Sequence, residues 1–462
     1  MLPKNGGFFS FLSEIWDDEG SDLSDLDEGY ESEISVSDDI KLGVFLDRAI
    51  GLARLYFGRL LSLHLAWLYL CGSVKSFRTK KMKQIDVGVA QVLAVQKALR
   101  SPFLDIYFSL TAFFAEEEFY LITLPILFWN IDYEFGKHMN YIVCFGLFVG
   151  NTIKDVFELP RPASPPVWRP KHQESIDSTM MKDFGFPSTH TMNAVSNSLF
   201  TYYYLAVTAS AVTGVSSHTI CIAATLLWIL SLTVGRLYLG AHSVVDIVGG
   251  FWLGLVVVAV YVYCESGISA FVATTPLLGL KCLIAGIVAL LLLPQPRPPT
   301  PTFMQNALLV GLITGAAVGQ RFRLEAGIAG TNAQEPIFEW SANAMRQYPS
   351  SVAILRTVIG YAFVLSVRFV LKPTLRALLG VIGVYKKPSV VIKTRKGGKK
   401  DSAAPKSARR NRRGRVVMLL TRGVDIVGGA IIKCLTYFAM AFSITFAVPF
   451  MFHSLGIAST SA

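Results

Sequence analysis

The sequence predicts an all-α protein that crosses a membrane several times. Hydrophobic residues make up 52% of the 462 residues and charged residues 16%, which is more apolar than ordinary soluble domains. The apolar residues gather in blocks near the ~20 residues that a helix needs to cross a bilayer. No stretch alternates at period two over enough residues for a membrane barrel. Helices are the other way to satisfy backbone groups in lipid, so we expect a polytopic helical protein.

Charged residues gather in segments that we expect to lie outside the bilayer. Residues 17–39 carry eleven acidic residues and no Lys or Arg, which predicts a disordered acidic tail over residues 1–42. Residues 43–90 predict an interfacial amphipathic helix followed by a basic segment, residues 75–83, that marks the cytoplasmic side. Thirteen Lys and Arg residues in 386–415 predict a basic cytoplasmic loop beside anionic lipid rather than a nucleic-acid contact.

The apolar blocks give the expected spans. Those of a membrane core, residues 91–264, are 92–114, 119–131, 138–153, 192–212, 220–237 and 244–263. Additional transmembrane helices are expected in residues 265–385, at 270–293, 306–320 and 352–370, and a C-terminal one in residues 416–462, at 427–452. Gly250 and Gly254 form a GxxxG spacing, which permits close helix packing.

Three polar clusters stand at the ends of these spans: residues 154–162, 186–190 and 235–246. Simple up-and-down threading of the spans brings all three to one face of the membrane. The same threading puts the basic residues 75–83 on the other face, so the clusters are expected to be lumenal or extracellular.

The clusters contain groups suited to a phosphate ester. Lys154, Arg161 and Arg236 supply three cations, and guanidinium groups match phosphate oxygens. Pro187 is expected in the first turn of a helix, where Ser188, Thr189 and free backbone N–H groups can hold an anion.

Two histidines complete this set. His242 and Asp246 are four residues apart, so on a helix the carboxylate can orient the imidazole as a nucleophile. His190 is then the general acid that protonates the leaving alkoxide and later helps to deprotonate water. The expected course is attack on phosphorus by His242 and hydrolysis of a phosphohistidine intermediate.

The pattern K-x6-R-P, P-S-x-H and R-x5-H-x3-D resembles the signature of the type 2 phosphatidic acid phosphatase superfamily. The resemblance implies a six-helix catalytic core over residues 91–264, no metal and no cofactor. It assigns phosphate binding to five residues, and catalysis to His190, His242 and Asp246 in the roles above; the five are Lys154, Arg161, Ser188, Thr189 and Arg236. Two positions depart from the signature, because Thr189 stands where the family usually has Gly and Gly235 where it usually has Ser.

Residues 161–169 and 184–191 further resemble the sphingosine 1-phosphate phosphatase branch. This branch implies hydrolysis of sphingosine or dihydrosphingosine 1-phosphate in the endoplasmic reticulum membrane, with the active site on the lumenal face. The lipid phosphate and the bilayer are the expected partners, and the sequence sets no oligomeric state. Two alternatives stay open: a broader phosphatase acting on phosphatidic acid or a polyprenyl diphosphate, and a transporter of anionic lipids.

A carboxylate is expected to select the substrate. A sphingoid phosphate carries an ammonium group near its phosphate, and phosphatidic acid does not. Glu116, Glu117 and Glu118 fall between the first two expected spans, on the face of the clusters. We predict that Glu117 receives the ammonium group.

Overall fold

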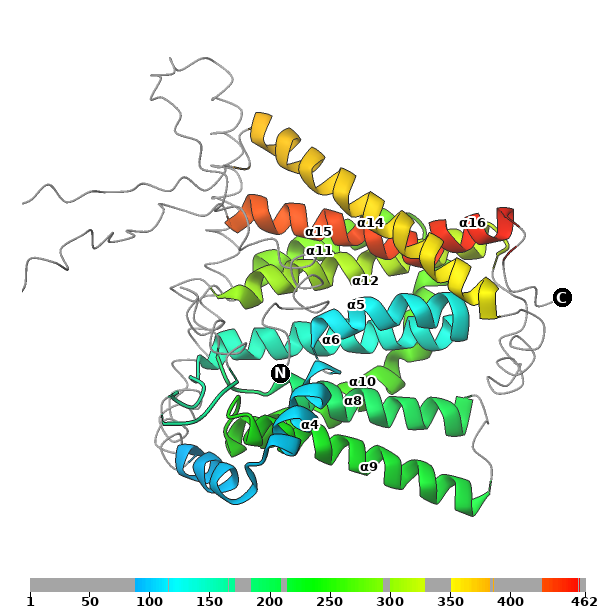
Figure 1. Cartoon of the computed structure of the whole chain (residues 1–462). Helices are drawn as coiled ribbons and strands as arrows, with labels where there is room; N and C mark the ends of the chain where they lie inside the picture. Colours follow the sequence, from blue (N-terminus) through cyan, green and yellow to red (C-terminus); the bar gives the residue numbers. More distant parts are fainter. Residues whose placement is uncertain are drawn as a thin grey trace, which may run out of the picture.

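The computed structural model describes residues 88–114, 116–164, 166–170, 184–208, 214–293, 300–328, 350–382, 385, 426–455 and 457. In these ranges the regular secondary structure is helical, and most helices run side by side in a bundle (Figure 1). Five of the helices are long and apolar enough to cross a membrane, which makes this a multi-pass membrane protein: Val215–Tyr238, Val244–Thr274, Pro301–Glu325, Ser351–Val381 and Gly428–Ser454.

The first expected span, residues 92–114, was wrong as one continuous helix. The structure has a helix at residues 88–99 and a second, α4 (Pro102–Phe113), with a break at Ser101. Ser101 caps α4 by accepting a hydrogen bond from the Leu104 amide, and Pro102 cannot continue a preceding helix. Twelve residues of helix rise only about 18 Å, too short for the ~30 Å hydrocarbon core.

Both short helices lie at one end of the bundle. The Ser101 amide donates to the Tyr238 hydroxyl at 3.1 Å, and a Cβ on Gly88 would lie 3.0 Å from that of Ser243. The basic segment 75–83 lies outside the described residues, and the side of the membrane on which it lies remains a prediction.

The helices of the core follow the sequence more closely. α5 (Glu117–Ile126) continues as the π-helix η1 (Leu127–Ile131), and α6 (Tyr133–Phe157) follows after the cap residue Asp132. α8 (Thr189–Tyr203) continues as the π-helix η2 (Tyr204–Thr208). α9 (Val215–Tyr238) and α10 (Val244–Thr274) complete the core, and α10 runs without interruption through the expected domain boundary at residue 264.

The helices after the core are α11 (Leu278–Leu292), α12 (Pro301–Glu325), α14 (Ser350–Val381), α15 (Ile426–Phe442), the π-helix η4 (Ser443–Ala447) and α16 (Val448–Ser454). Asp155, at the end of α6, accepts hydrogen bonds from the hydroxyls of Thr300 at 2.9 Å and Thr302 at 2.7 Å. This pairing fixes the start of α12 beside the end of α6.

Glycines allow close approach at two helix pairs. A Cβ on Gly250 would lie 2.4 Å from the Ser188 carbonyl oxygen, so the predicted GxxxG packs α10 against α8. A second seam, Gly311, Gly315 and Gly319 on α12, packs against the backbone and side chains of α15 and η4. The same four-residue spacing marks this seam in the sequence.

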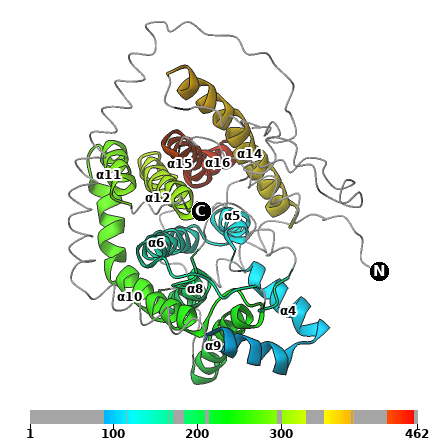
Figure 2. The same ribbon diagram turned by 90° about the vertical axis from the view of Figure 1, so that its left-hand side faces the viewer.

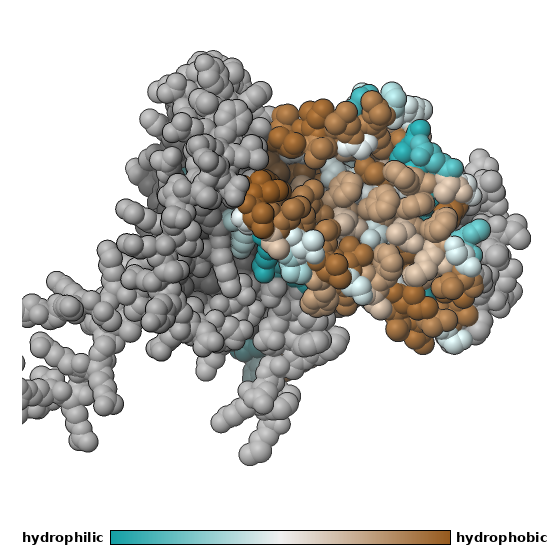
Figure 3. Space-filling model, turned by 90° about the horizontal axis from the view of Figure 1, so that it is seen from above, coloured by the Kyte–Doolittle hydropathy of each residue, from teal (hydrophilic) through white to brown (hydrophobic). Residues whose placement is uncertain are grey.

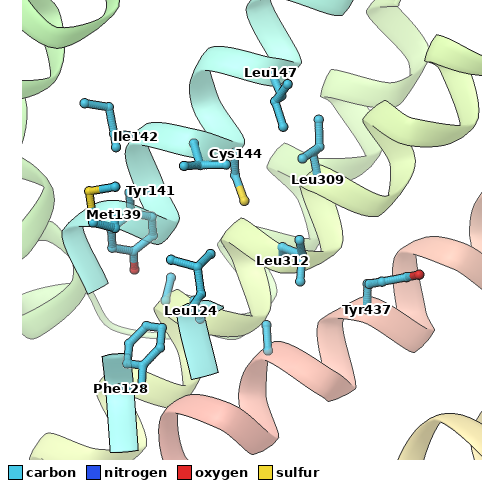
Figure 4. Packing of buried hydrophobic residues seen from close by; sticks show 14 of the residues in the cluster. Leu124, Phe128, Met139, Tyr141, Ile142, Cys144, Leu147, Leu309, Leu312 and Tyr437 are labelled. Carbon is cyan, nitrogen blue, oxygen red and sulfur yellow. The ribbon is translucent and has the colours of Figure 1, made fainter. Parts of the chain in front are cut away.

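The core of the bundle includes α5, α6, α12 and α15, whose apolar side chains interdigitate in Figure 4. The described residues on the face shown in Figure 3 are largely hydrophobic, as expected for a surface in contact with lipid. The expected acidic tail (1–42), residues 43–87 of the expected interfacial and basic segment (43–90) and the basic loop 386–415 lie outside the described residues. The domain boundaries remain predictions.

Candidate functional site

The three polar clusters meet at one end of the bundle, which faces the viewer in Figure 2. Lys154 lies in the last turn of α6, His190 in the first turn of α8 and Arg236 in the last turn of α9. His242 lies in the loop between α9 and α10, and its ring centroid is 6.2 Å from that of His190. The helix ends thus bring together groups that are up to 88 residues apart in the chain.

Arg161 reaches the site on a loop that turns sharply away from α6. Glu158 ends α6 in the left-handed conformation with φ 48°, and an antiparallel bridge then pairs Pro160 with Phe184. The Arg161 guanidinium donates to the Ala241 carbonyl at 3.5 Å, next to His242. The loop therefore carries a cation to Ala241, the residue before His242.

His242 is fully buried, and its Nδ1 atom lies 3.7 Å from Oδ2 of Asp246. The expectation that the two share a helix face was wrong, because α10 begins only at Val244 and His242 lies before its cap residue Ser243. A capping box brings the pair together instead. The Ser243 amide donates to Asp246 Oδ2 at 2.8 Å, and the Asp246 amide donates to the Ser243 hydroxyl at 3.3 Å.

The turn before His242 requires glycine. Gly240 has φ +70°, and a Cβ there would lie 2.3 Å from a methyl group of Val167. Arg169, which the sequence reading did not single out as a site residue, is buried and donates to the Gly240 carbonyl at 3.1 Å and to the Pro162 carbonyl. Arg169 thus ties the loop of Arg161 to the loop of His242.

The surroundings of His242 keep its imidazole neutral. Burial is the main cause that lowers the pKa of His242 well below its ordinary value of 6.5, and the charges of Arg161, Lys154 and Arg236 lower it further. A neutral ring has a free lone pair at neutral pH. Such a ring, beside three cations, is suited to attack an anionic phosphorus centre.

The start of α8 differs from the expectation by one residue. Pro187 lies before the helix, and Ser188 is the cap residue, whose hydroxyl accepts from the Thr191 amide at 3.4 Å. The Ser188 amide donates to the Asp246 carbonyl at 2.9 Å, which joins the starts of α8 and α10. Ser188 and Thr189 are both buried at the first turn of α8, where helix N–H groups favour an anion.

Both departures from the family signature have a packing partner. A Cβ on Gly150 of α6 would lie only 2.8 Å from the γ-methyl group of Thr189. The glycine on α6 therefore makes room for the threonine on α8. A Cβ on Gly235 would come within 2.9 Å of the Phe108 ring on α4. A serine at position 235 would collide with that ring.

Glu116 joins the site, a contact that no local sequence pattern predicted. Its Oε1 atom lies 3.2 Å from Nη2 of Arg236 and 3.2 Å from Nε2 of His190. Glu116 precedes α5, and Glu117 is the first residue of that helix; the Glu117 side chain lies outside the described part. The carboxylate of Glu116 therefore lies between Arg236, which the sequence predicts to bind phosphate, and His190, the expected acid.

The site joins cations, a buried neutral imidazole and a second imidazole beside a carboxylate. Within the described ranges no group of three or more His, Cys, Asp and Glu side chains has the arrangement of a metal site. The chemistry that these residues can perform is nucleophilic attack on a phosphate held by Arg161 and Arg236, with proton transfer through His190. Metal independence stays a prediction, which a chelator tests.

Comparison with known proteins agrees with this chemistry. Residues 136–269 match the family model of the PAP2 superfamily, and the match includes all three clusters. The chain is 28% identical over 381 residues to "Lipid phosphate phosphatase delta" of Arabidopsis thaliana, covering 80% of this chain and 87% of the relative. No solved structure gave a significant match.

Shorter matches reach proteins named for sphingoid phosphates. The chain is 33% identical over 161 residues to a dihydrosphingosine 1-phosphate phosphatase of Schizosaccharomyces pombe, covering 35% of this chain and 38% of the relative. It is 30% identical over 176 residues to "Sphingosine-1-phosphate phosphatase 2" of Homo sapiens, covering 36% and 40%. The chain thus spans less than half of the length of these two relatives.

Proposed function

The chain carries a PAP2 superfamily domain at residues 136–269, and from this premise we propose that it is a membrane phosphatase that hydrolyses a sphingoid base phosphate. The products are the free sphingoid base and inorganic phosphate. The observation that carries the proposal is the buried His242, which lies 3.7 Å from Asp246 and 6.2 Å between ring centroids from His190, where the three polar clusters meet.

The residues divide the work as follows. Arg161, Arg236 and Lys154 neutralise the phosphate, assisted by Ser188 and Thr189 at the start of α8. His242 attacks phosphorus in line with the leaving alkoxide, which receives a proton from His190. Water then attacks the phosphohistidine while His190 takes up its proton, and Asp246 keeps the His242 ring oriented throughout.

The sphingoid substrate is supported by two observations. Several relatives are named for sphingosine or dihydrosphingosine 1-phosphate, although a lipid phosphate phosphatase covers more of the chain. In addition, the carboxylate of Glu116 lies 3.2 Å from both His190 and Arg236, close to where the ammonium group of a bound sphingoid phosphate would lie. We keep the prediction that this run receives the ammonium group.

Phosphate release by the detergent-solubilised full chain tests the function. We expect release from sphingosine 1-phosphate that persists with a metal chelator and exceeds release from phosphatidic acid. Release from phosphatidic acid or a polyprenyl diphosphate alone would keep the mechanism and replace the substrate. If no lipid phosphate loses phosphate, the phosphatase proposal is wrong and a lipid transporter becomes the better hypothesis.

The membrane and the side of the site are further proposals. By resemblance we place the protein in the endoplasmic reticulum with its site on the lumenal face. The charge distribution weighs against that side, because residues 75–83 end five residues before Gly88 at the site. α14 ends and α15 begins at the site-bearing end of the bundle (Figure 1), and the basic residues 386–415 lie between these two helices in the sequence. Basic loops favour the cytoplasmic side.

An inserted N-glycosylation acceptor decides between the two sides, because only lumenal acceptors are modified. For a lumenal site, an acceptor placed in residues 171–182 is glycosylated and one placed in residues 329–349 is not. The reverse result would place the site on the cytoplasmic face.

A further inference from the structure

The short helix that precedes α4 lies against the segments that carry the site. It covers residues 88–99 and lies beside α4 at the site-bearing end of the bundle (Figure 2). Its buried face includes Gly88, Val92 and Gln96, each four residues after the last. A Cβ on Gly88 would lie 3.0 Å from that of Ser243, the residue after His242. The family match begins only at residue 136, so this helix lies outside the matched domain.

The side-chain amide of Gln96 joins two segments of the site. Its Nε2 atom donates to the Trp168 carbonyl at 2.8 Å and to the Tyr238 carbonyl at 2.9 Å. Its Oε1 atom accepts from the Trp168 amide at 3.1 Å. Trp168 lies on the loop of Arg161, and Tyr238 is the last residue of α9, where the loop of His242 begins. Gln96 is 6% exposed, so these hydrogen bonds are shielded from water.

Tyr238 connects helix 88–99 and α4 with the nucleophile. It is 1% exposed and lies two residues after Arg236 and four residues before His242. Its hydroxyl donates to Asp105 Oδ1 at 2.6 Å and accepts from the Ser101 amide at 3.1 Å. Helix 88–99 therefore binds the backbone of this residue, and the start of α4 binds its side chain.

The loops of Arg161 and His242 are joined directly as well. Arg169 donates to the Gly240 carbonyl at 3.1 Å, two residues after Tyr238 and one residue after Trp168 in the respective loops. Gln96 binds the residue beside Arg169 on one loop and the residue just before the Gly240 turn on the other. Helix 88–99 thus reinforces, from outside the matched domain, the same connection that Arg169 makes within it.

We propose that Gln96 is a positioning residue, which holds the loop of His242 against the loop of Arg161 so that the imidazole lies in line with the bound phosphate. The proposal rests on the proposed role of His242 as nucleophile. Gln96 acts through the backbone of Trp168 and Tyr238 and does not itself contact the substrate. Without its amide the two loops can shift relative to each other. A shift of about 1 Å in a reacting group can lower a rate about 100-fold.

Gln96→Met tests the proposal, because it keeps the approximate size of the side chain and removes all three hydrogen bonds. The reading is the single-turnover rate at which the full chain acquires label from a ³²P-labelled lipid phosphate that the wild type hydrolyses. We expect this rate to fall about 10–100-fold. The charges that bind phosphate remain, so KM changes far less.

Gln320→Met is the matched control for the loss of a buried glutamine. Gln320 is 8% exposed on α12, and its Oε1 atom accepts from the Tyr141 hydroxyl at 3.3 Å. Neither residue lies at the site-bearing end. We expect Gln320→Met to lower the thermal midpoint of unfolding while the rate of labelling stays near that of the wild type.

Arg100→Gln keeps the test decisive if Gln96→Met fails to fold. Arg100 is exposed, and its guanidinium carbon lies 4.0 Å from the centroid of the Trp168 ring. An exposed cation–π contact contributes about 0.5–1 kcal/mol, so we expect labelling to slow about two- to fivefold. Lys97→Gln, which removes an exposed cation from the same helix, is the control and should leave the rate unchanged.

The outcomes separate the positioning role from the proposed function. Labelling at the wild-type rate in Gln96→Met and Arg100→Gln would overturn the positioning role, and so would an equal loss in Gln320→Met. Wild-type protein that releases phosphate without acquiring label would overturn the role of His242 as nucleophile, on which the proposal rests. Wild-type protein that releases no phosphate from any lipid would overturn the proposed function itself.

Discussion

His242→Ala is expected to lower chelator-resistant phosphate release by about 10⁴-fold or more, the loss that follows when a covalent nucleophile is removed. The ring is fully buried beside Asp246 at the start of α10, and His190, whose ring centroid lies 6.2 Å away, is proposed for proton transfer instead. The cations remain, so the substrate still binds. We therefore expect KM to change far less than kcat.

The intermediate gives a second readout. Wild-type protein quenched during turnover of ³²P-labelled substrate should retain label that is stable to base and released by acid, as for a phosphohistidine. His190→Ala should retain label longer, because the group that activates water is gone. His453→Ala, an exposed histidine at the end of α16, is the control. Unchanged turnover in His242→Ala would rule out this residue as the nucleophile.

The site was predictable where its geometry is local. The clusters 154–162, 186–190 and 235–246 each span at most twelve residues, and in each the spacing reflects a helix end, a cap or a tight turn. Even so, the reason for the His242–Asp246 pair was different from the expected one. A Ser followed by Asp three residues later is a capping signal, and it places the carboxylate beside the residue before the cap.

Contacts between distant segments were not predictable in the same way. Glu116 and Arg236 are 120 residues apart, and tertiary packing, including that of α4 against α9, brings them together. The hydropathy of residues 92–114 suggested one span, because apolar content does not show where one helix ends and the next begins. Ser101 and Pro102 mark a helix start that divides this segment into two helices.

Glu116→Gln is expected to narrow the preference for sphingosine 1-phosphate over phosphatidic acid by about 10–100-fold. The substitution keeps the shape of the side chain and removes its charge, and a charged hydrogen bond contributes about 1.5–3 kcal/mol. The loss falls on the substrate with an ammonium group. Phosphatidic acid has none, and its phosphate gains from removal of a carboxylate that lies 3.2 Å from Arg236.

The measurement is kcat/KM for both lipids with wild type, Glu116→Gln and Glu117→Gln. Glu325→Gln, at the far end of α12, is the matched control for loss of one carboxylate. A changed preference in Glu117→Gln alone would return the ammonium site to the residue that the sequence favoured. If Glu116→Gln lowers kcat/KM equally for both lipids, Glu116 only positions Arg236 and His190. A residue that binds the ammonium group must affect the lipid that has this group more than the lipid that lacks it.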